Sequence, residues 1–190
     1  MNNLPTLDEL RIDCGLERLR LGATIIQQTI FDRIKNDIIK GNMIKNNINS
    51  IAPICFLKDF FSKETHFLYI LYCTNLINKK QTPKWVLNKL DKYGFYIYVG
   101  ETSNIIRRIV EHKRGSGSPK TSLFMEIELK YLECYNSKDH SYILKRENEI
   151  SRLTMEQQKN IVDLFYDNEP NASFIINNLN EIINNWRTNI

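Results

Sequence analysis

An arginine and a histidine stand four residues apart in a segment with helical spacing, at Arg108 and His112. Residues at this spacing lie on one face of a helix, and Asn104 occupies the same face one turn earlier. A guanidinium group offers a permanent charge and a fixed fork of donors, which suits a phosphate and the charge that develops on it during transfer. The pair therefore indicates a site for phosphoryl chemistry, although a solvated helix face has the same spacing.

A single carboxylate interrupts the apolar stripe of a later helical segment, where Ile143, Glu147 and Ile150 follow one another at i, i+4 and i+7. Acidic side chains are rarely buried unless they are paired or bound to a metal. Glu147 is therefore a candidate for a metal ligand or for the partner of an arginine. The alternative is a position at the border of the stripe, with the carboxylate in water.

Two tyrosines, Tyr69 and Tyr98, lie in segments with strand-like composition. Positive charge from a metal or an arginine favours the phenolate form of a tyrosine. A tyrosine that acts as a base near neutral pH needs a large shift from its usual pKa of about 10. Each of the two is therefore either a core aromatic or a group that activates water only with strong help.

The first part of the chain, residues 1–62, has mainly helical patterns. A capping box begins at Thr6, Gly15 is expected to end a first helix, and Gly41 is expected to end a second one. The second helix carries isoleucines at four-residue spacing, namely Ile26, Ile30, Ile34 and Ile38. Such a pair of helices is either a helix-turn-helix or an appendage for packing or dimerisation.

Strand periodicity follows in three segments. Residues 66–73 and 94–100 are apolar and aromatic throughout, which is typical of central strands. Residues 124–134 alternate between apolar and charged side chains, so this strand is expected to have one wet face near a sheet edge. Helices are predicted over 82–92, 104–113 and 137–153, and two more helical stretches are separated at Asn168-Glu169-Pro170.

The composition limits the class of protein. The chain has 190 residues with 42% hydrophobic and 25% charged residues, which is typical of a globular domain. A net charge of +4 permits a nucleic-acid partner without requiring one. The cysteines are far apart and form no CxxC pair, which argues against a zinc site or a disulfide framework and favours reduced thiols in the cytoplasm. No signal-peptide pattern and no apolar run of about 20 residues is found, so no membrane association is expected.

Three of these segments together resemble the GIY-YIG nuclease signature. The segment from Tyr98 to His112, which begins Tyr98-Val99-Gly100, resembles its second half, and Phe67-Leu68-Tyr69 resembles its first half. Lys145-Arg146-Glu147-Asn148 resembles the helix that gives the family its metal-binding glutamate. The resemblance covers roughly residues 66–171. Phe67 departs from it by replacing a glycine, Glu101 takes a position where small residues are common, and the stretch between the tyrosine motifs is long.

The resemblance implies an α+β fold in which a small, mainly antiparallel three-stranded sheet is flanked by helices. It divides the chain into a helical N-terminal extension at 1–62, a nuclease module at 63–172, and a C-terminal helix at 173–190 that packs on the module or on a partner. We expect an endonuclease that hydrolyses double-stranded DNA with one Mg²⁺ or Mn²⁺ ion in each active site.

The resemblance also implies a role for each candidate residue. Glu147 would hold the metal ion, and Tyr69 or Tyr98 would orient or deprotonate the attacking water. Arg108 would stabilise the phosphate in the transition state, and His112 would assist proton transfer or position a tyrosine. The family's late asparagine near the metal would be Asn160, Asn168 or Asn171.

Further expectations concern partners. The basic loop with Lys113, Arg114 and Lys120 is expected to contact DNA phosphates, and Asn171 is a further candidate for DNA contact. Helices precede the module and little follows it, which favours a restriction enzyme that forms a homodimer on a symmetric site. The alternatives are a phage or mobile-element nuclease, or a catalytically silent DNA-binding or assembly module of the same fold.

Overall fold

A three-stranded antiparallel sheet forms the centre of the computed structural model, which describes residues 7–40 and 65–186. The strands are β1 (Thr65–Leu76), β2 (Tyr96–Thr102) and β3 (Phe124–Asn136), in the order β2-β1-β3. The most apolar strand therefore has a hydrogen-bonded neighbour on each side, while β2 and β3 are edge strands. This arrangement confirms the predicted α+β class and the edge position of the third strand.

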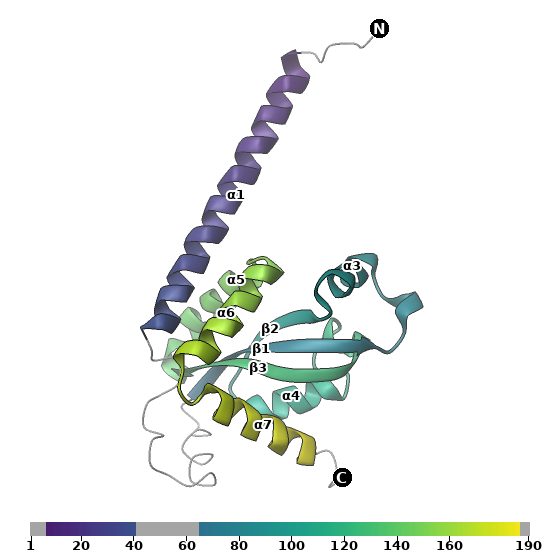
Figure 1. The fold of residues 1–190 in the computed structure, drawn as a ribbon, viewed down its shortest axis with the longest axis vertical. Coiled ribbons are helices and arrows are strands. Elements are labelled where there is room, and N and C mark those ends of the chain that lie inside the picture. Colours follow the sequence, from purple (N-terminus) through teal and green to yellow (C-terminus); the bar gives the residue numbers. More distant parts are fainter. Residues whose placement is uncertain (1–6, 41–64, 187–190) are drawn as a thin grey trace.

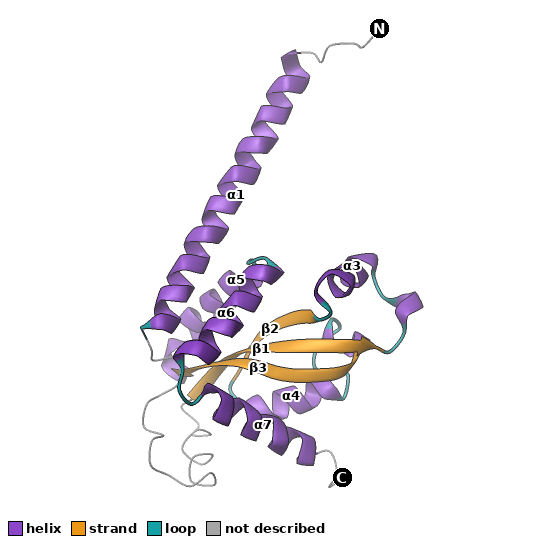
Figure 2. Ribbon diagram, in the orientation of Figure 1, coloured by secondary structure: helices purple, strands orange, loops and turns teal. Residues whose placement is uncertain are grey.

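Helices cover both faces of the sheet (Figure 1 and Figure 2). On one face lie α5 (His140–Ser151) and α6 (Met155–Asn168), and on the other lie α4 (Ile105–Lys113) and α7 (Ala172–Trp186). The division follows from the alternation of side chains along a strand. Tyr69 contacts His112 of α4, whereas Tyr131 contacts Phe165 of α6. Strand β1 is therefore buried on both of its sides.

A long helix, α1 (Leu7–Ile39), precedes the sheet and stands out from the body of the molecule (Figure 1). Its C-terminal part packs against α6 and α5, where Ile34 and Ile38 are fully buried. The helix continues through Gly15, so the predicted break there is wrong, and so is the helix-turn-helix that depended on it. Glycine costs a helix about 1 kcal/mol relative to alanine, which weakens a helix without ending it. The predicted cap at Thr6 and stop at Gly41 lie outside the described residues.

The long stretch between the two tyrosine motifs contains α3 (Lys84–Tyr93), after a short 3-10 turn, η1 (Lys79–Gln81). Pro83 is the N-cap of α3 and not its first helical residue as predicted, while Gly94 ends the helix with a φ of 80° that glycine adopts at little cost. Two further 3-10 turns, η2 (Thr121–Leu123) and η3 (Ser137–Asp139), precede β3 and α5, so α5 begins later than predicted.

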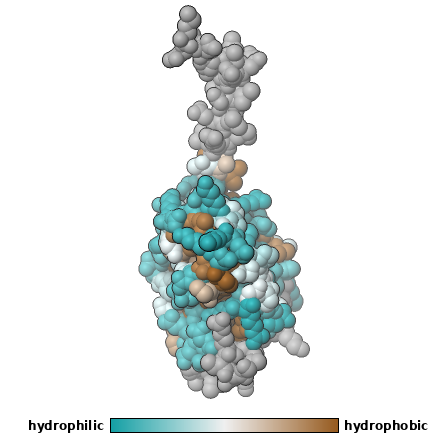
Figure 3. Space-filling view, turned by 90° about the vertical axis from the view of Figure 1, so that its right-hand side faces the viewer, coloured by the Kyte–Doolittle hydropathy of each residue, from teal (hydrophilic) through white to brown (hydrophobic). Residues whose placement is uncertain are grey.

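The surface around α3 is mainly hydrophilic, with hydrophobic residues gathered in small patches (Figure 3). None of the helices within residues 7–40 and 65–186 is both long and apolar enough to cross a membrane.

A β-bulge divides β3 into two halves. Leu71 pairs with Leu129 and Ile70 pairs with Tyr131, so Lys130 has no partner in β1. One unpaired residue moves every following side chain to the opposite face of the sheet. The alternating pattern of the sequence predicts that Leu129 and Tyr131 share a face, but the bulge places them on opposite faces.

The predicted wet face of β3 is found only in the first half of the strand. Glu126 and Glu128 are exposed, whereas Glu133 is fully buried beneath α5. The side chain of Arg146 donates hydrogen bonds to both carboxylate oxygens of Glu133 at 3.0–3.3 Å and reaches Asp37 of α1 at 2.7 Å. A buried carboxylate is stable there because it is paired.

Candidate active site

Four of the predicted site residues meet on the α4 face of the sheet. The ring of His112 lies edge-on to Tyr69 and Tyr98, at centroid distances of 6.0 and 4.8 Å. The two tyrosine rings are 6.4 Å apart. Arg108 lies one turn before His112, with its guanidinium beside the Tyr69 phenol. Tyr69 and His112 are buried, while Tyr98 and Arg108 are partly exposed, so the cluster has a buried base and a rim in contact with solvent.

A chain of hydrogen bonds fixes the tautomer of His112. The Thr121 hydroxyl donates its single proton to the carbonyl of Ser118 at 3.1 Å. Its oxygen must therefore accept the hydrogen bond from His112 Nδ1, at 2.7 Å. His112 Nε2 is then the acceptor nitrogen, and the Tyr69 hydroxyl donates to it at 2.9 Å. The proton of Tyr69 thus points at a lone pair of the imidazole.

Burial sets the protonation states of this pair. Burial, together with the charge of Arg108, lowers the pKa of His112 to about 4, so the ring is neutral at pH 7. Burial also raises the pKa of Tyr69, as do the neighbouring Tyr98 and Glu147, while Arg108 opposes the rise. Tyr69 is therefore protonated at neutral pH, and the neutral ring of His112 accepts its hydrogen bond.

Two glycines allow these rings to lie against the backbone. A Cβ atom on Gly117 would be 2.5 Å from His112 Nδ1. A Cβ atom on Gly100 would be 2.6 Å from the nearest ring carbon of Tyr69. Gly100 belongs to the Tyr98-Val99-Gly100 segment. Gly117 belongs to the loop that was predicted to contact DNA, so part of this loop packs on the base of the cluster instead.

Glu147 approaches the cluster from α5, which covers the other face of the sheet and packs mainly against β2. Burial and the charge of Glu101 raise the pKa of Glu147, and the charge of Glu147 in turn contributes to the raised pKa of Tyr69. The structure thus places Glu147 within electrostatic range of Tyr69, although α4 and α5 lie on opposite faces.

The environment of Glu147 fits an oxygen ligand of a divalent cation. Its side chain is half-buried and has no hydrogen-bond or ion-pair partner among the described residues. The neighbouring arginine of α5, Arg146, is already paired with Glu133. Mg²⁺ is commonly held by one or two carboxylates together with water and substrate phosphate. The alternative role of Glu147 as the partner of an arginine receives no support from these contacts.

The basic residues predicted to contact DNA have different surroundings. Lys113 Nζ donates to Asn184 Oδ1 of α7 at 2.7 Å, whereas Arg114 and Lys120 are exposed. Arg114 lines a groove along the outer side of α4, and Arg107 lines the same groove. Two arginines therefore face one surface channel next to the cluster.

The three candidates for the late asparagine lie on or beside α6. Asn160 is exposed, and the side chain of Asn168 donates to the carbonyl of Leu164 in its own helix at 2.8 Å. Asn171 lies directly before α7. Helix α6 packs mainly against α1, with further contacts to β3 and α7, and the choice among the three asparagines stays a prediction.

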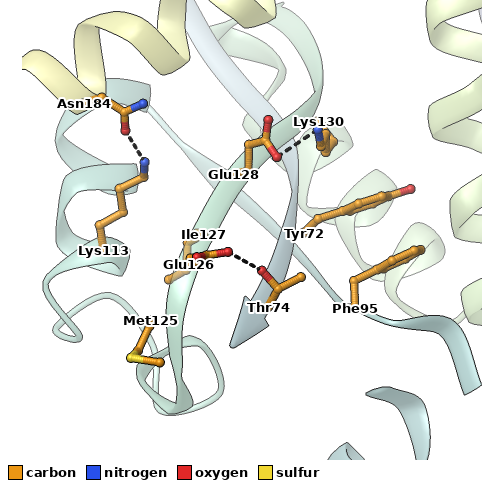
Figure 4. Close-up of a pocket in the computed structure, with 10 residues that line it drawn as sticks. All are labelled: Tyr72, Thr74, Phe95, Lys113, Met125, Glu126, Ile127, Glu128, Lys130 and Asn184. Atoms are coloured by element: carbon orange, nitrogen blue, oxygen red, sulfur yellow. Dashed lines mark hydrogen bonds and ion pairs between the residues drawn. The ribbon is translucent and has the colours of Figure 1, made fainter. Parts of the chain in front are cut away.

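A separate pocket lies further along the sheet (Figure 4). Tyr72 and Phe95 stack there with ring centroids 4.2 Å apart, and the Thr74 hydroxyl donates to Glu126 at 3.0 Å. Thr74 lies beyond Tyr69 along β1. None of the five predicted catalytic residues lines this pocket, so it is distinct from the cluster around His112.

Sequence reasoning missed two kinds of residue. Thr121 and Gly117 come from a loop, where no periodic pattern indicates that their atoms meet His112. It also missed the convergence of His66, Glu101 and His140 near one end of β1. The two histidines could have been noted as possible ligands, but no spacing in the sequence brings them together.

Comparisons with known proteins agree with this geometry. A family model described as "GIY-YIG catalytic domain" matches residues 65–160, which include all five predicted catalytic residues. A UPF0213 protein of Staphylococcus epidermidis is 31% identical over 81 residues, which cover 38% of this chain and 96% of that protein. A UPF0213 protein of Natronomonas pharaonis is 35% identical over 66 residues, which cover 35% of this chain and 75% of that protein. No solved structure matches the chain. The family match spans half of the sequence and includes the whole sheet, and the chain belongs to the GIY-YIG family.

Proposed function

We propose that the protein is a metal-dependent endonuclease that hydrolyses phosphodiester bonds of double-stranded DNA. We propose further that it acts as a type II-like restriction enzyme. Membership of the GIY-YIG family supports a nuclease-type hydrolase. The observation that carries the catalytic proposal is the hydrogen bond from the Tyr69 hydroxyl to a neutral His112, beside the guanidinium of Arg108. This arrangement combines a proton acceptor with a fixed positive charge.

Arg108 is suited to hold the scissile phosphate. Its side chain is partly exposed, and one of its nitrogens donates to Glu111 at 3.1 Å, which leaves other donors for a ligand. The neighbouring phenols and Glu111 keep its pKa above the ordinary value despite burial, so its charge is permanent. It stabilises the negative charge that builds on the phosphate oxygens during attack.

The proton of the attacking water follows the hydrogen bonds of the cluster. A phosphate bound at Arg108 offsets the positive charge that helps to lower the pKa of His112, so the ring becomes a better proton acceptor in the complex. The water oxygen forms a bond to phosphorus and gives a proton to Tyr69 Oη, while Tyr69 passes its own proton to His112 Nε2. A bridging P–O bond breaks, and the leaving sugar oxygen takes a proton from solvent. His112 then returns its proton to solvent. Tyr98, at the solvent-exposed rim and 4.8 Å from His112 by ring centroids, is suited to orient the water.

Glu147 is the residue that we expect to hold Mg²⁺ or Mn²⁺. When bound, a divalent cation neutralises charge on the phosphate and on the leaving oxygen. Burial and the nearby charge of Glu101 both disfavour the ionised form of Glu147. A bound cation would therefore stabilise this carboxylate.

The replacement of a glycine by Phe67 is the feature of the sequence that favours a catalytically silent module, and the surroundings of Phe67 count against that alternative. Phe67 is fully buried in the core and the Tyr69–His112 hydrogen bond is formed in its presence. The absence of a glycine at this position therefore does not disturb the charged and polar groups of the cluster.

Restriction at a symmetric site requires two copies of the active site, so the proposal includes a homodimer. The projecting helix α1 exposes Ile25 and Ile26, with 57% and 61% of their surface accessible, and offers an apolar contact for a second copy. Sedimentation analysis would then give about twice the chain mass of 22.5 kDa.

Plasmid cleavage in Mg²⁺ tests the proposed activity. We expect the wild-type chain to convert supercoiled plasmid into discrete fragments, and Glu147→Gln to be slower by at least about 100-fold. The matched control is Glu149→Gln on the same helix, because Glu149 pairs with Arg33 of α1 and lies outside the cluster. A wild-type chain that is inert with Mg²⁺ and Mn²⁺, or a Glu147→Gln variant of full activity, would refute the nuclease proposal. A smear without bands would refute restriction alone.

A further inference from the structure

We propose that His66, Glu101 and His140 form a second metal site, which takes a divalent transition-metal ion such as Zn²⁺ and is separate from the Glu147 carboxylate. The three residues come from different elements: the start of β1, the end of β2 and the first residue of α5. The proposal does not depend on the nuclease activity, because it rests on the positions of these side chains alone.

The potential ligand atoms of the three side chains converge on one point. Nε2 of His66 forms a close ion-pair contact with Glu101 Oε2, and Nε2 of His140 lies 3.6 Å from the same oxygen. One ligand atom from each residue lies within 4.8 Å of the others, and the two imidazole rings have centroids 4.8 Å apart. Two imidazoles and a carboxylate are a donor set that suits Zn²⁺.

The distances are close to those that a bound ion requires. Bonds of about 2.0–2.2 Å to a tetrahedral Zn²⁺ place its ligand atoms about 3.3 Å apart. His140 makes most of the adjustment, because 52% of its side chain is accessible, whereas His66 and Glu101 are 12% and 26% accessible. Two ligands are therefore held by the sheet, and the third can close over the ion from α5.

A cation explains this cluster better than an ion pair does. One carboxylate oxygen faces two imidazoles, and two protonated rings at this distance would repel each other while one carboxylate balances only one charge. Neutral imidazoles each present a lone pair, and a divalent ion would bond to both. The third histidine of the chain, His112, is hydrogen-bonded at both ring nitrogens, so it does not compete for the ion.

An ion at this site would fasten α5 to the ends of β1 and β2. His140 and Glu147 are seven residues apart, about two turns, and lie on the same side of α5. The site would therefore hold the N-terminal end of the helix that carries Glu147, and we expect bound Zn²⁺ to raise the unfolding temperature of the protein.

Titration of the full chain with Co²⁺, followed by displacement with Zn²⁺, tests the proposal. We expect one equivalent of Co²⁺ to give visible d–d absorption, and Zn²⁺ to abolish it. His140→Ala is expected to lower the affinity at least about 10-fold and to remove the thermal stabilisation by Zn²⁺. Ser141→Ala, an exposed neighbour, is the matched control.

Several results would overturn the proposal. These are a wild-type chain without Co²⁺ absorption, equal binding by His140→Ala, and the near-ultraviolet charge-transfer bands that mark cysteine thiolates as the ligands. Circular dichroism establishes that each variant is folded. If His66→Ala fails to fold, the exposed His140 still provides the test, since its removal leaves no buried cavity.

Discussion

Gly100 lies directly against the phenol of Tyr69, so that a Cβ atom on Gly100 would be 2.5 Å from the Tyr69 hydroxyl oxygen and 2.6 Å from the adjacent ring carbon. The two residues are paired across β1 and β2. Real Cβ atoms do not approach this closely, and the ring of Tyr69 is buried and hydrogen-bonded to His112. The glycine thus sets the position of the Tyr69 hydroxyl.

We therefore expect Gly100→Ala to displace the Tyr69 ring and to break its hydrogen bond to His112. A misplacement of about 1 Å can lower a rate about 100-fold, and we expect a loss of this size in the single-turnover rate of plasmid nicking. Gly22→Ala in α1 is the matched control, because no atom lies within 4 Å of a Cβ built there. Wild-type activity in Gly100→Ala would show that the position of this phenol does not matter.

Thr121 is predicted to act as a positioning residue that fixes the His112 tautomer. Thr121→Val preserves the shape but leaves His112 Nδ1–H without its acceptor, so the ring is free to present a proton to Tyr69 instead of a lone pair. The cleavage rate should fall about 10- to 100-fold with little change in DNA affinity. Thr121→Ser keeps the hydroxyl and should restore most of the rate. Equal rates for Val and Ser at this position would contradict the assigned tautomer.

The lowered pKa of His112 predicts a loss of stability in acid. The folded-state pKa is about 4, below the value of about 6.5 that is expected in the unfolded chain. Between these pH values the unfolded chain binds a proton that the folded chain excludes. The free energy of unfolding therefore falls as the pH is lowered through this range, and the contribution is complete above about pH 6.5.

Denaturant unfolding between about pH 4 and pH 7 measures this effect. The full shift corresponds to on the order of 3 kcal/mol. His112→Gln does not titrate, so it should lack this part of the pH dependence, and the difference between the two curves isolates the contribution of His112. Identical curves for wild type and variant would mean that His112 is not held neutral.

The buried pair of Arg146 and Glu133 predicts a large dependence of stability on both partners. Arg146→Met leaves a carboxylate fully buried without its guanidinium, which costs about 3–5 kcal/mol. The double variant Arg146→Met with Glu133→Gln removes the uncompensated charge and should recover much of the loss. Lys145→Met, at an exposed neighbouring position, should change the free energy of unfolding by less than about 0.5 kcal/mol. Additive single and double variants would show that the pair is not coupled.

If the basic residues next to the cluster contact DNA phosphates, their removal should make DNA binding less dependent on salt concentration. Each phosphate contact that is lost lowers the slope of log affinity against log salt by about 0.9. We expect this change for Arg114→Gln and for Lys120→Gln, and a smaller one for Lys113→Gln because Lys113 is bonded to Asn184. Lys159→Gln on α6 is the control, since its ammonium pairs with Asp163. Unchanged slopes for all variants would place the DNA elsewhere.

The sequence by itself determined those features that depend on near neighbours in the chain. Continuous apolar runs predict β1 and β2, and Gly94 is predicted to end α3, where the structure gives it a φ of 80°. The sequence also places a helix over 104–113, although Asn104 is its N-cap and not a helical residue as predicted. The spacing of Arg108 and His112 places them on one face of α4 for the same reason, since helical geometry is local. The family resemblance, which rests on such segments, is confirmed by the match to residues 65–160.

Only the tertiary structure decided which distant atoms meet. The bulge at Lys130 reverses the faces of β3, the helices above the strand bury Glu133 against Arg146, and Thr121 supplies the acceptor for His112. Packing distances between remote segments depend on every side chain around them, so one unpaired strand residue or one loop hydroxyl changes the result without altering any local pattern.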